Sequence, residues 1–193
     1  MIKLYIADII ENCEILPCFS EYRKNKISKI KDVTHLYQSA TAERLLCYAA
    51  KKENLSLPLN IVINENQKPF ANDFSFNISH SHQKVVLAVS KNTVGVDIEK
   101  INHFQNLKVA KKFLTEKEAE NIDINLFFEY FTKKESYFKM LGKAFPLKPV
   151  AFENFEKCFF ETFKTDDYTV TVCSPFEFNL MIENVSQISL LNL

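Results

Sequence analysis

The stretch KVVLAVSKNTVGVDIEK, residues 84–100, decides the fold that we expect from this sequence. It holds two runs rich in β-formers, KVVLAVS and TVGVDIE, joined by KN, which is the pattern of a β-hairpin. Side chains two residues apart in a strand share a face, so Asp97 and Glu99 point to the same side. The sequence therefore predicts two like charges side by side on a strand that is otherwise apolar.

The flanking sequence predicts a mixture of helices and strands. A helix is expected at THLYQSATAERLLCYAAKK, and another from about Asn106 that starts again at TEKE and runs through NLFFEYFTKKESYFKMLG. Strands are expected at IKLYIADI, LPLNIVI and FSFNIS, and alternation after Pro146 predicts an antiparallel meander of KCFFETFK, DYTVTVC and FEFNLMIE. No low-complexity linker is present, so a domain boundary, if any, falls near residue 100.

Composition restricts the partners and the compartment. The 193 residues carry 24 basic and 24 acidic side chains, a balance that argues against nucleic acid or an anionic membrane as partner. Five cysteines are scattered without CxxC spacing, and no apolar run approaches the roughly 20 residues of a membrane span. We therefore expect a cytoplasmic protein. The sequence has only two glycines, Gly95 and Gly142, and each is expected where a side chain would obstruct a neighbour.

Three carboxylates are candidates for a metal site. Asp97 and Glu99 repel each other unless a cation lies between them, and hard oxygen ligands with open positions suit Mg²⁺ beside a phosphate. The alternative is a strand end that emerges into solvent. Glu135 falls on the edge of the apolar stripe formed by Phe131 and its neighbours, so it points inward and needs a cation. The alternative there is an ordinary pair with Lys139, one turn away.

Phosphate-binding candidates surround these acids. His80 follows a strand in FNISHSH, among hydroxyl groups, and a His80-x-His82 pair is also compatible with zinc. Arg44, Lys68 and a basic run from Arg23 to Lys31 supply positive charge, although such a run is commonly a solvated face. Glu118 has a structural explanation, because TEKE is a capping box.

The motifs together resemble a known family, the 4′-phosphopantetheinyl transferases of the surfactin-synthetase-activating type. The resemblance rests on FNISHS, GVDIEK, FLTEKE and FTKKESYFKMLGK in the family's order, with AERLL and QKPF upstream, and covers about residues 40–147. It implies Mg²⁺-dependent transfer of the 4′-phosphopantetheine of coenzyme A to a serine of an apo acyl or peptidyl carrier protein, with release of 3′,5′-ADP. It also implies an α+β, pseudo-twofold monomer of two similar halves, residues 1–100 and 101–193, with mostly antiparallel sheets and the active site in the cleft between them.

The resemblance also implies a role for each matching residue. Asp97, Glu99 and Glu135 would hold Mg²⁺, and Glu135, or a water held by the metal, would accept the serine proton. Glu118, Glu135 and Lys139 are the expected catalytic residues. The expected coenzyme A ligands are Arg44, Lys68, Ser79, His80, Lys134 and Lys139, with one of Lys26, Lys29 and Lys31 undecided. Two departures are visible, since Phe131 stands where the family commonly has tryptophan and Ala144 replaces a glycine.

Two alternatives to the transferase stay open at this point. The chain could be a non-catalytic homologue that binds coenzyme A or a carrier protein, or a zinc hydrolase built on His80, His82, Asp97 and His103. For a transferase, the acidic, helical carrier is expected to meet a basic and apolar rim that includes Lys112, Lys133, Phe145 and the KAFPLKP loop.

Overall fold

The computed structural model of the chain describes residues 1–12, 14–65, 68–72, 74–101, 112–146 and 148–193. The strands are β1 (Ile2–Asp8), β2 (Ile61–Ile63), β3 (Pro69–Ala71), β4 (Ser75–Ser81), β5 (Lys84–Ser90), β6 (Gly95–Lys100), β7 (Phe159–Thr165), β8 (Tyr168–Ser174) and β9 (Leu180–Asn184). The helices are α1 (Glu21–Ile27), α2 (Val33–Lys52), α3 (Glu116–Ala119), α4 (Ile124–Leu141), the 3-10 helix η2 (Phe152–Asn154) and α5 (Gln187–Leu191).

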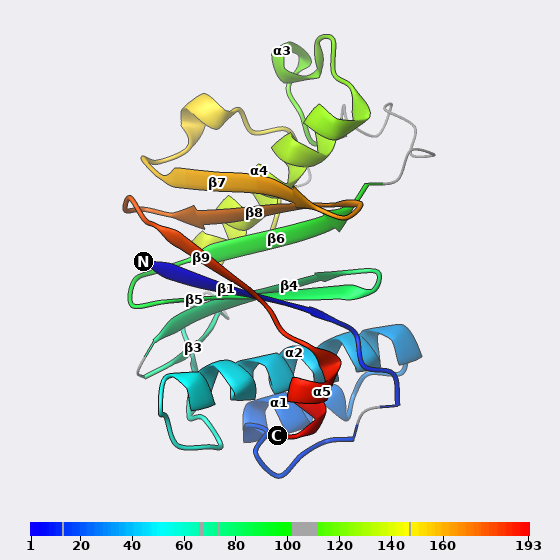
Figure 1. The fold of residues 1–193 in the computed structure, drawn as a ribbon. Helices are drawn as coiled ribbons and strands as arrows, with labels where there is room; N and C mark the ends of the chain where they lie inside the picture. The colour runs from blue at the N-terminus through cyan, green and yellow to red at the C-terminus, as the bar shows by residue number, and fades with distance from the viewer. Residues whose placement is uncertain (13, 66–67, 73, 102–111, 147) are drawn as a thin grey trace.

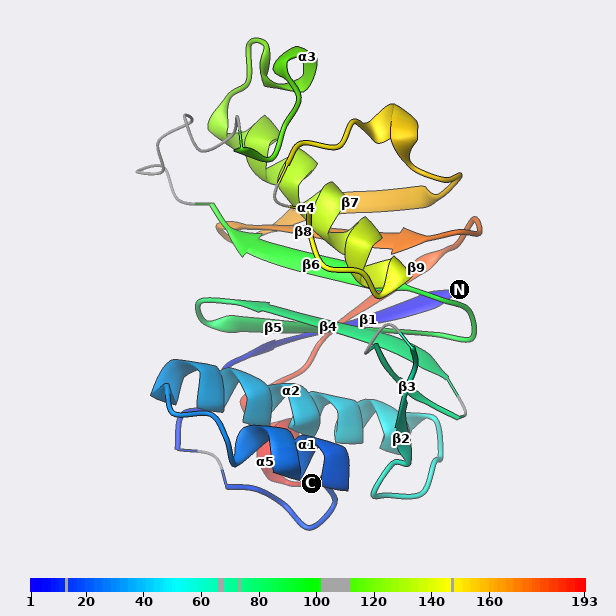
Figure 2. The same cartoon turned by 180° about the vertical axis from the view of Figure 1, so that it is seen from behind.

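Two sheets form the centre of the molecule. The first has the strand order β4-β5-β1-β9 and the second β6-β8-β7, while β2 and β3 make a separate two-stranded ribbon. The sheets lie one above the other, with α2, α1 and α5 beside the first sheet and α4 across the second (Figures 1 and 2). All strand pairs are antiparallel except that of β1 with β9. The described structure is thus α+β with mostly antiparallel sheets, as predicted.

A shared apolar core holds the two sheets face to face. Ile2, Leu4 and Ile6 of β1 pack in one cluster with Val96 and Ile98 of β6. The opposite face of the first sheet packs in a different cluster with the alanine- and leucine-rich face of α2. The alternation along β6 therefore sends its valine and isoleucine toward the first sheet, and its two acids toward α4.

The predicted hairpin of residues 84–100 is wrong. β5 pairs with β4 in register Ser81↔Lys84 and with β1, whereas β6 crosses to the second sheet and pairs with β8. The hairpin in this region is β4–β5, which turns at His82, a residue with positive φ. Both edges of β5 are already occupied, so the following strand has to find its partner elsewhere.

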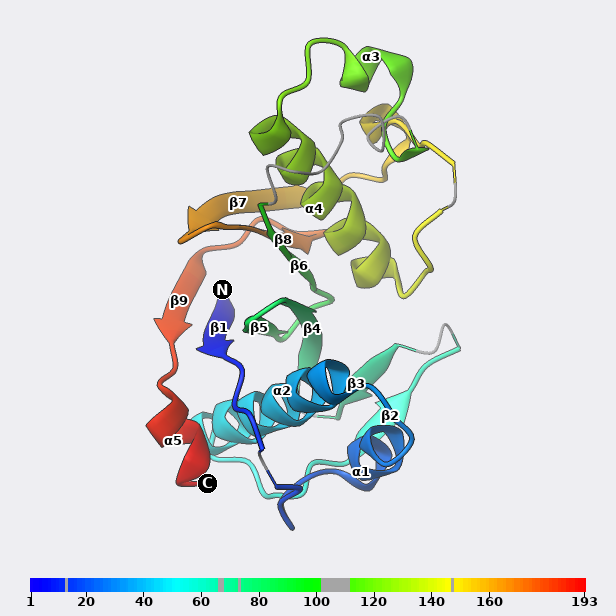
Figure 3. The ribbon, with the colours of Figure 1, turned by 90° about the vertical axis from the view of Figure 1, so that its right-hand side faces the viewer.

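The predicted C-terminal meander is only partly right. β7 and β8 form an antiparallel hairpin, but β9 leaves that sheet and pairs in parallel with β1, from Ile2↔Leu180 to Ile6↔Asn184. Figure 3 shows β9 descending from the second sheet to the edge of the first. Each sheet therefore contains a strand from the other side of residue 100, and the division into two halves at that residue stays a prediction.

Helix ends and close contacts follow local chemistry. Asp32 caps α2 and Asp123 caps α4 through their side chains, and Thr115 and Glu118 form the predicted capping box of α3. Gly142 ends α4 with a φ of 67°, in the left-handed region that favours glycine. The start of the second predicted helix, about residue 106, lies outside the described residues.

Gly95 confirms the expectation of an obstructed position. A Cβ atom placed on it would lie 2.0 Å from the carbonyl oxygen of Ser136 and 2.7 Å from the backbone nitrogen of Met140. Only glycine lets the start of β6 touch the backbone of α4 this closely. Among the described residues, no helix is both long and apolar enough to cross a membrane.

Candidate active site

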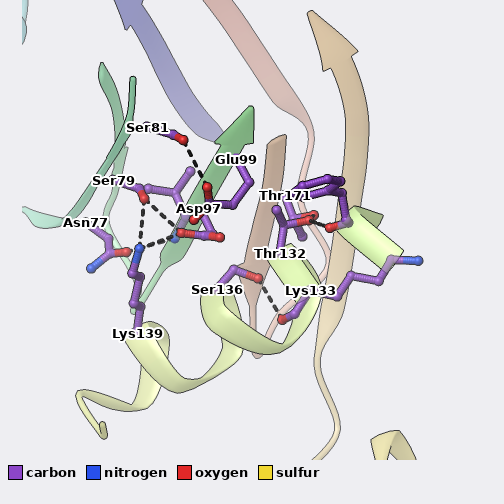
Figure 4. A network of polar contacts seen from close by, with 12 residues as sticks. Asn77, Ser79, Ser81, Asp97, Glu99, Thr132, Lys133, Ser136, Lys139 and Thr171 are labelled. Atoms are coloured by element: carbon purple, nitrogen blue, oxygen red, sulfur yellow. Dashed lines mark hydrogen bonds and ion pairs between the residues drawn. The ribbon is translucent and has the colours of Figure 1, made fainter. Parts of the chain in front are cut away.

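The two sheets meet at a seam of side chains between β4 and β6. The Asn77 side chain accepts a hydrogen bond from the backbone N–H of Val96 at 2.8 Å, and the Ser81 hydroxyl accepts one from the N–H of Lys100 at 3.2 Å. Asn77, Ser79 and Ser81 alternate along β4, so all three point toward β6. This seam joins edges that have no backbone ladder between them, and it sets the position of Asp97 and Glu99 (Figure 4). Sequence reasoning missed Asn77 and Ser81; their alternation with Ser79 in FNISHS was the available signal.

Asp97 lies at the centre of the seam. Its side chain is 2% exposed, and Oδ1 accepts from the Ser79 hydroxyl at 2.8 Å and from Lys139 Nζ at 2.6 Å. Lys139 also donates to Ser79 Oγ at 2.8 Å. Oδ2 of Asp97 is buried and has no hydrogen-bond partner in the described part of the chain. A buried ionised oxygen without a partner is costly, so this atom marks a place for a cation or a donor from a ligand.

Glu99 and Glu135 complete the acidic group. Glu99 accepts a hydrogen bond from the Ser81 hydroxyl at 2.9 Å. Burial, and then the negative charge of Asp97, raise the pKa of Glu99 and that of Glu135 to about 7. Both carboxyls therefore feel the field of Asp97, from β6 and from α4. The structure brings together the three acids that the sequence singled out.

The same group raises the pKa of Lys139. Burial acts against its charge, but Asp97, Glu135 and Glu99 outweigh burial and stabilise the ammonium. Lys139 is therefore a fixed cation beside three acids, with its side chain 30% exposed at the surface of the seam.

No group of three or more histidine, cysteine, aspartate or glutamate side chains in the described residues is arranged closely enough to hold a metal ion by itself. The donor chemistry nevertheless fits Mg²⁺, because the available ligands are all oxygens and one of them is unpartnered. Mg²⁺ usually keeps several waters and takes one or two carboxylates plus substrate phosphates, so a complete protein cage is not required.

His80 lies on the other face of β4, away from Asp97. Its side chain is exposed, and its ring centroid lies 6.3 Å from that of His35 on α2. Partial desolvation, and then the positive charges of Lys139, His35 and Arg23, lower the pKa of His80. His80 therefore lies within the electrostatic reach of Lys139, His35 and Arg23. Sequence reasoning had not assigned His35, and nothing in its spacing indicated it.

Arg23 is the member of the basic run that the fold buries. Its Nε donates to Glu43 Oε2 at 3.1 Å, and Glu43 also accepts from Ser20 at 2.8 Å, so α1 is fixed to α2. Burial, together with the charge of Arg23, lowers the pKa of Lys26. Lys26, Lys29 and Lys31 are all exposed, and Lys26 is the one whose pKa responds to the charge of Arg23.

Lys68 joins two elements at the other end of the seam. Its Nζ donates to the carbonyl oxygens of Val94 at 2.8 Å and Met140 at 2.9 Å, and burial lowers its pKa to about 8. A cavity of about 520 Å³ lies beside it, lined also by Lys91, Thr93 and Met140. Lys68 therefore lies at the wall of this cavity and ties the chain before β6 to the end of α4.

Arg44 and Lys134 lie in the interior, with partners in the protein itself. Arg44 donates to the carbonyl oxygens of Leu190 at 3.0 Å and Glu14 at 3.1 Å. Lys134 Nζ donates to Glu118 Oε2 at 2.6 Å. Glu118 is one of the residues that are expected from the sequence to be catalytic. The roles that the sequence predicted for these three residues stay predictions.

The remaining candidates are the expected zinc ligands and the expected carrier-binding rim. His82 faces a turn, His80 points away from Asp97, and His103 lies outside the described residues, so the proposed zinc cluster is not assembled in the described part. Lys112 is exposed and Phe145 is partly exposed, while Lys133 pairs with Glu129 at 2.6 Å.

Comparison with known proteins finds relatives in one family. Residues 93–184 match the 4′-phosphopantetheinyl transferase superfamily. The 4′-phosphopantetheinyl transferase gsp of Aneurinibacillus migulanus is 37% identical over 136 residues, which cover 65% of this chain and 56% of that protein. A 4′-phosphopantetheinyl transferase of Bacillus subtilis is 25% identical over 192 residues, 85% of each chain, and the transferase Sfp of Bacillus subtilis (strain 168) is 27% identical over 125 residues, 53% of this chain and 55% of that protein. The chain thus spans about half the length of two of these relatives, and the predicted resemblance is confirmed.

Proposed function

We propose that this chain, whose residues 93–184 belong to the 4′-phosphopantetheinyl transferase superfamily, transfers the 4′-phosphopantetheine of coenzyme A to a serine of an apo acyl or peptidyl carrier protein. The observation that carries the proposal is the convergence of Asp97, Glu99, Glu135 and Lys139 at the seam. Three acids and one lysine at one point suit a metal-bound pyrophosphate. The proposal includes a cytoplasmic monomer that needs neither nucleic acid nor a membrane.

Mg²⁺ is the metal of this proposal, held by Asp97, Glu99 and Glu135. Two observations support a bound cation: Oδ2 of Asp97 has no partner within the part of the chain that the structure describes, and the pKa values of Glu99 and Glu135 are raised. Both reflect uncompensated negative charge, which a divalent cation between the acids would neutralise. When bound, Mg²⁺ would supply neutralisation of the pyrophosphate charge.

Coenzyme A is held by its phosphates in this proposal. Lys139 and Ser79 lie beside Asp97 and would donate to the pyrophosphate. His80, with Arg23 and His35 nearby, would hold an anionic part of the nucleotide, and the cavity beside Lys68 offers room for the rest. The neutral state that the lowered pKa of His80 favours leaves one ring nitrogen able to donate.

The chemical step needs charge balance and a proton acceptor. The carrier serine oxygen would form a bond to the phosphorus that bears pantetheine, while the bond to the bridging oxygen of the pyrophosphate breaks and 3′,5′-ADP leaves with the electron pair. Glu135 is the proposed acceptor of the serine proton, because it is the acid that α4 brings to the seam, beside Asp97 and Lys139. Lys139 would stabilise the charge on the departing phosphate.

Intact mass spectrometry tests the proposal. An apo carrier protein is incubated with this protein, coenzyme A and Mg²⁺, beside an EDTA control. If the carrier gains the mass of one phosphopantetheine group with Mg²⁺ but not with EDTA, the result supports the transferase. No gain with several carriers, despite measurable binding of coenzyme A, would favour the non-catalytic binding homologue.

A further inference from the structure

Lys134 and Glu118 form a buried ion pair away from the seam. The Lys134 side chain is 1% exposed and its Nζ lies 2.6 Å from Glu118 Oε2. It also donates to the carbonyl oxygens of Val150 at 2.6 Å and Phe113 at 3.3 Å, and it lies 4.9 Å from the centroid of the Phe152 ring. These contacts occupy the donors of the ammonium, so none is left for a phosphate.

Glu118 is occupied in the same way. Oε2 accepts from the backbone N–H of Thr115 at 2.8 Å as well as from Lys134, and Oε1 accepts from the N–H of Phe152 at 3.2 Å. Burial alone would raise the pKa of Glu118, but these donors lower it overall and keep the group ionised. A carboxylate with this many donors is a poor base.

The pair ties two segments to α4. The first contains Phe113, Thr115 and α3, and the second consists of the described residues 143–146 and 148–152 between α4 and η2. The second segment is held at its start by the N–H of Lys143, which donates to the carbonyl oxygen of Phe138 at 2.9 Å, and at its far end by Val150 and Phe152. Without the pair, the first segment and the far end of the second would lose these hydrogen bonds, while the bond of Lys143 to Phe138 would remain.

These segments complete an aromatic face on α4. We use this name for four partly exposed side chains, those of Phe113, Phe131, Phe138 and Phe145. Ring centroids lie 5.1 Å apart for Phe113 and Phe131, and 5.6 Å apart for Phe145 with each of the other three. Phe131 and Phe138 stand one turn to either side of Glu135, so the face continues directly from the acids.

The charge around the aromatic face indicates its partner. Lys112, Lys143 and Lys148 are exposed on the two segments that supply Phe113 and Phe145. Apolar rings with a basic rim suit a protein surface that is apolar at its centre and acidic around it. The serine-bearing carrier has to approach Glu135, which places it against this face.

We propose that Lys134 and Glu118 are positioning residues, which hold Phe113 and Phe145 against α4 and so build the aromatic face that contacts an acidic carrier protein. The inference rests on the proposed transferase function. It assigns the pair an effect on carrier binding, with no contact to coenzyme A and no part in proton transfer.

The test uses the full chain with Lys134→Met/Glu118→Gln, a double variant that leaves no unpaired buried charge. Hydrogen exchange should accelerate in residues 112–119 and 143–152, and the KM for the carrier should rise about tenfold, well beyond any change in kcat or in the KM for coenzyme A. Phe145→Ala should raise the carrier KM without accelerating exchange in 112–119. Lys3→Met/Glu53→Gln, which removes a pair between β1 and the C-terminal end of α2, is the control for the loss of an ion pair elsewhere and should change neither.

Two results would overturn the inference. If the hydrogen-exchange rates and the KM for the carrier both equal the wild-type values, the pair does not hold the two segments in place. A rise confined to the KM for coenzyme A would place Lys134 at the coenzyme. If the double variant does not fold, Glu118→Asp keeps the charge and should give smaller changes of the same kind. Failure of the proposed function would be seen separately, because the wild-type protein would then modify no carrier. The hydrogen-exchange measurement would still test whether the pair holds the two segments.

Discussion

Lys134 and Lys139 of α4 each pair with a carboxylate from another element, and the two pairs differ in how many of their polar atoms have partners. In the pair of Lys134 and Glu118, the donors and acceptors are occupied by protein atoms, and the lysine is 1% exposed. In the pair of Lys139 and Asp97, one carboxylate oxygen is buried with no partner among the described residues, and the lysine is 30% exposed. A saturated pair stabilises a structure, whereas an unsaturated one has free bonding capacity for a ligand. The difference separates two lysines that look alike in the motif KKESYFK.

The largest effect is expected at Asp97. Asp97→Ala removes the unsaturated oxygen and the partner of Lys139, so transfer should fall by about a thousandfold, as for the loss of a main charge-stabilising group. Intact mass spectrometry of the carrier measures the rate, and a thermal melt checks the fold. Asp97→Asn keeps the shape of the side chain and removes its charge, so this matched variant should also be inactive. Turnover near the wild-type rate in either variant would break the comparison.

Gly95 tests how the seam is held against α4. Gly95→Ala forces a methyl group into the backbone of Ser136 and Met140, and should lower the free energy of unfolding by about 3 kcal/mol. Denaturant unfolding measures this loss. Gly142→Ala at the end of α4 is the control for a glycine that is needed for its φ instead, and should cost about 1 kcal/mol. Equal stability of the Gly95 variant and the wild type would contradict the close approach.

The pH dependence of stability sharpens the comparison. Glu99 and Glu135 have pKa values raised from 4.5 to about 7, so between these pH values the unfolded chain releases protons that the folded chain retains. The metal-free protein should therefore lose stability as pH rises through this window, and Mg²⁺ should restore it. Melting temperatures from pH 5 to 8 measure the trend.

The double variant Glu99→Gln/Glu135→Gln isolates this contribution. His80 acts in the opposite direction, because its lowered pKa makes the folded state less stable as pH falls. Subtracting the profile of the double variant removes the His80 contribution, and the remaining loss should lie between pH 4.5 and 7. A flat difference would mean that the two acids do not repel Asp97.

The smallest effect is expected at Thr169. Its buried hydroxyl has no partner within the described residues, and it lies on β8 opposite Glu99. Thr169→Val loses no hydrogen bond, so the free energy of unfolding should change by less than about 1 kcal/mol, with activity retained. A clear loss of activity would add Thr169 to the unsaturated group at the seam.

Local patterns predicted the elements well, and pairing between strands poorly. The helix at 33–52, the capping box at Thr115 and the shared face of Asp97 and Glu99 depend on neighbours in sequence, so they were visible. The partners of β6 and β9 depend on which sheet edges remain free, and residue patterns do not record this.

The site shows the same limit. Charge and periodicity identified Asp97, Glu99, Glu135 and Lys139, because a charge on an apolar face needs an explanation. Lys134 and Arg44 gave the same signal, yet their partners are carbonyl oxygens far away in sequence. The structure separates Lys134, whose donors are occupied by protein atoms, from Lys139, which lies beside the unpartnered oxygen of Asp97.

The parallel pairing of β1 with β9 has a consequence for biosynthesis. Residues 2–8 leave the ribosome early, but residues 180–184, which cover one edge of β1, are translated only after some 170 further residues. Until then the nascent first sheet has an open edge of unpaired backbone groups, which is a template for wrong pairing with another chain. Cells that synthesise this protein should benefit from a chaperone that shields the early strands until translation is nearly finished.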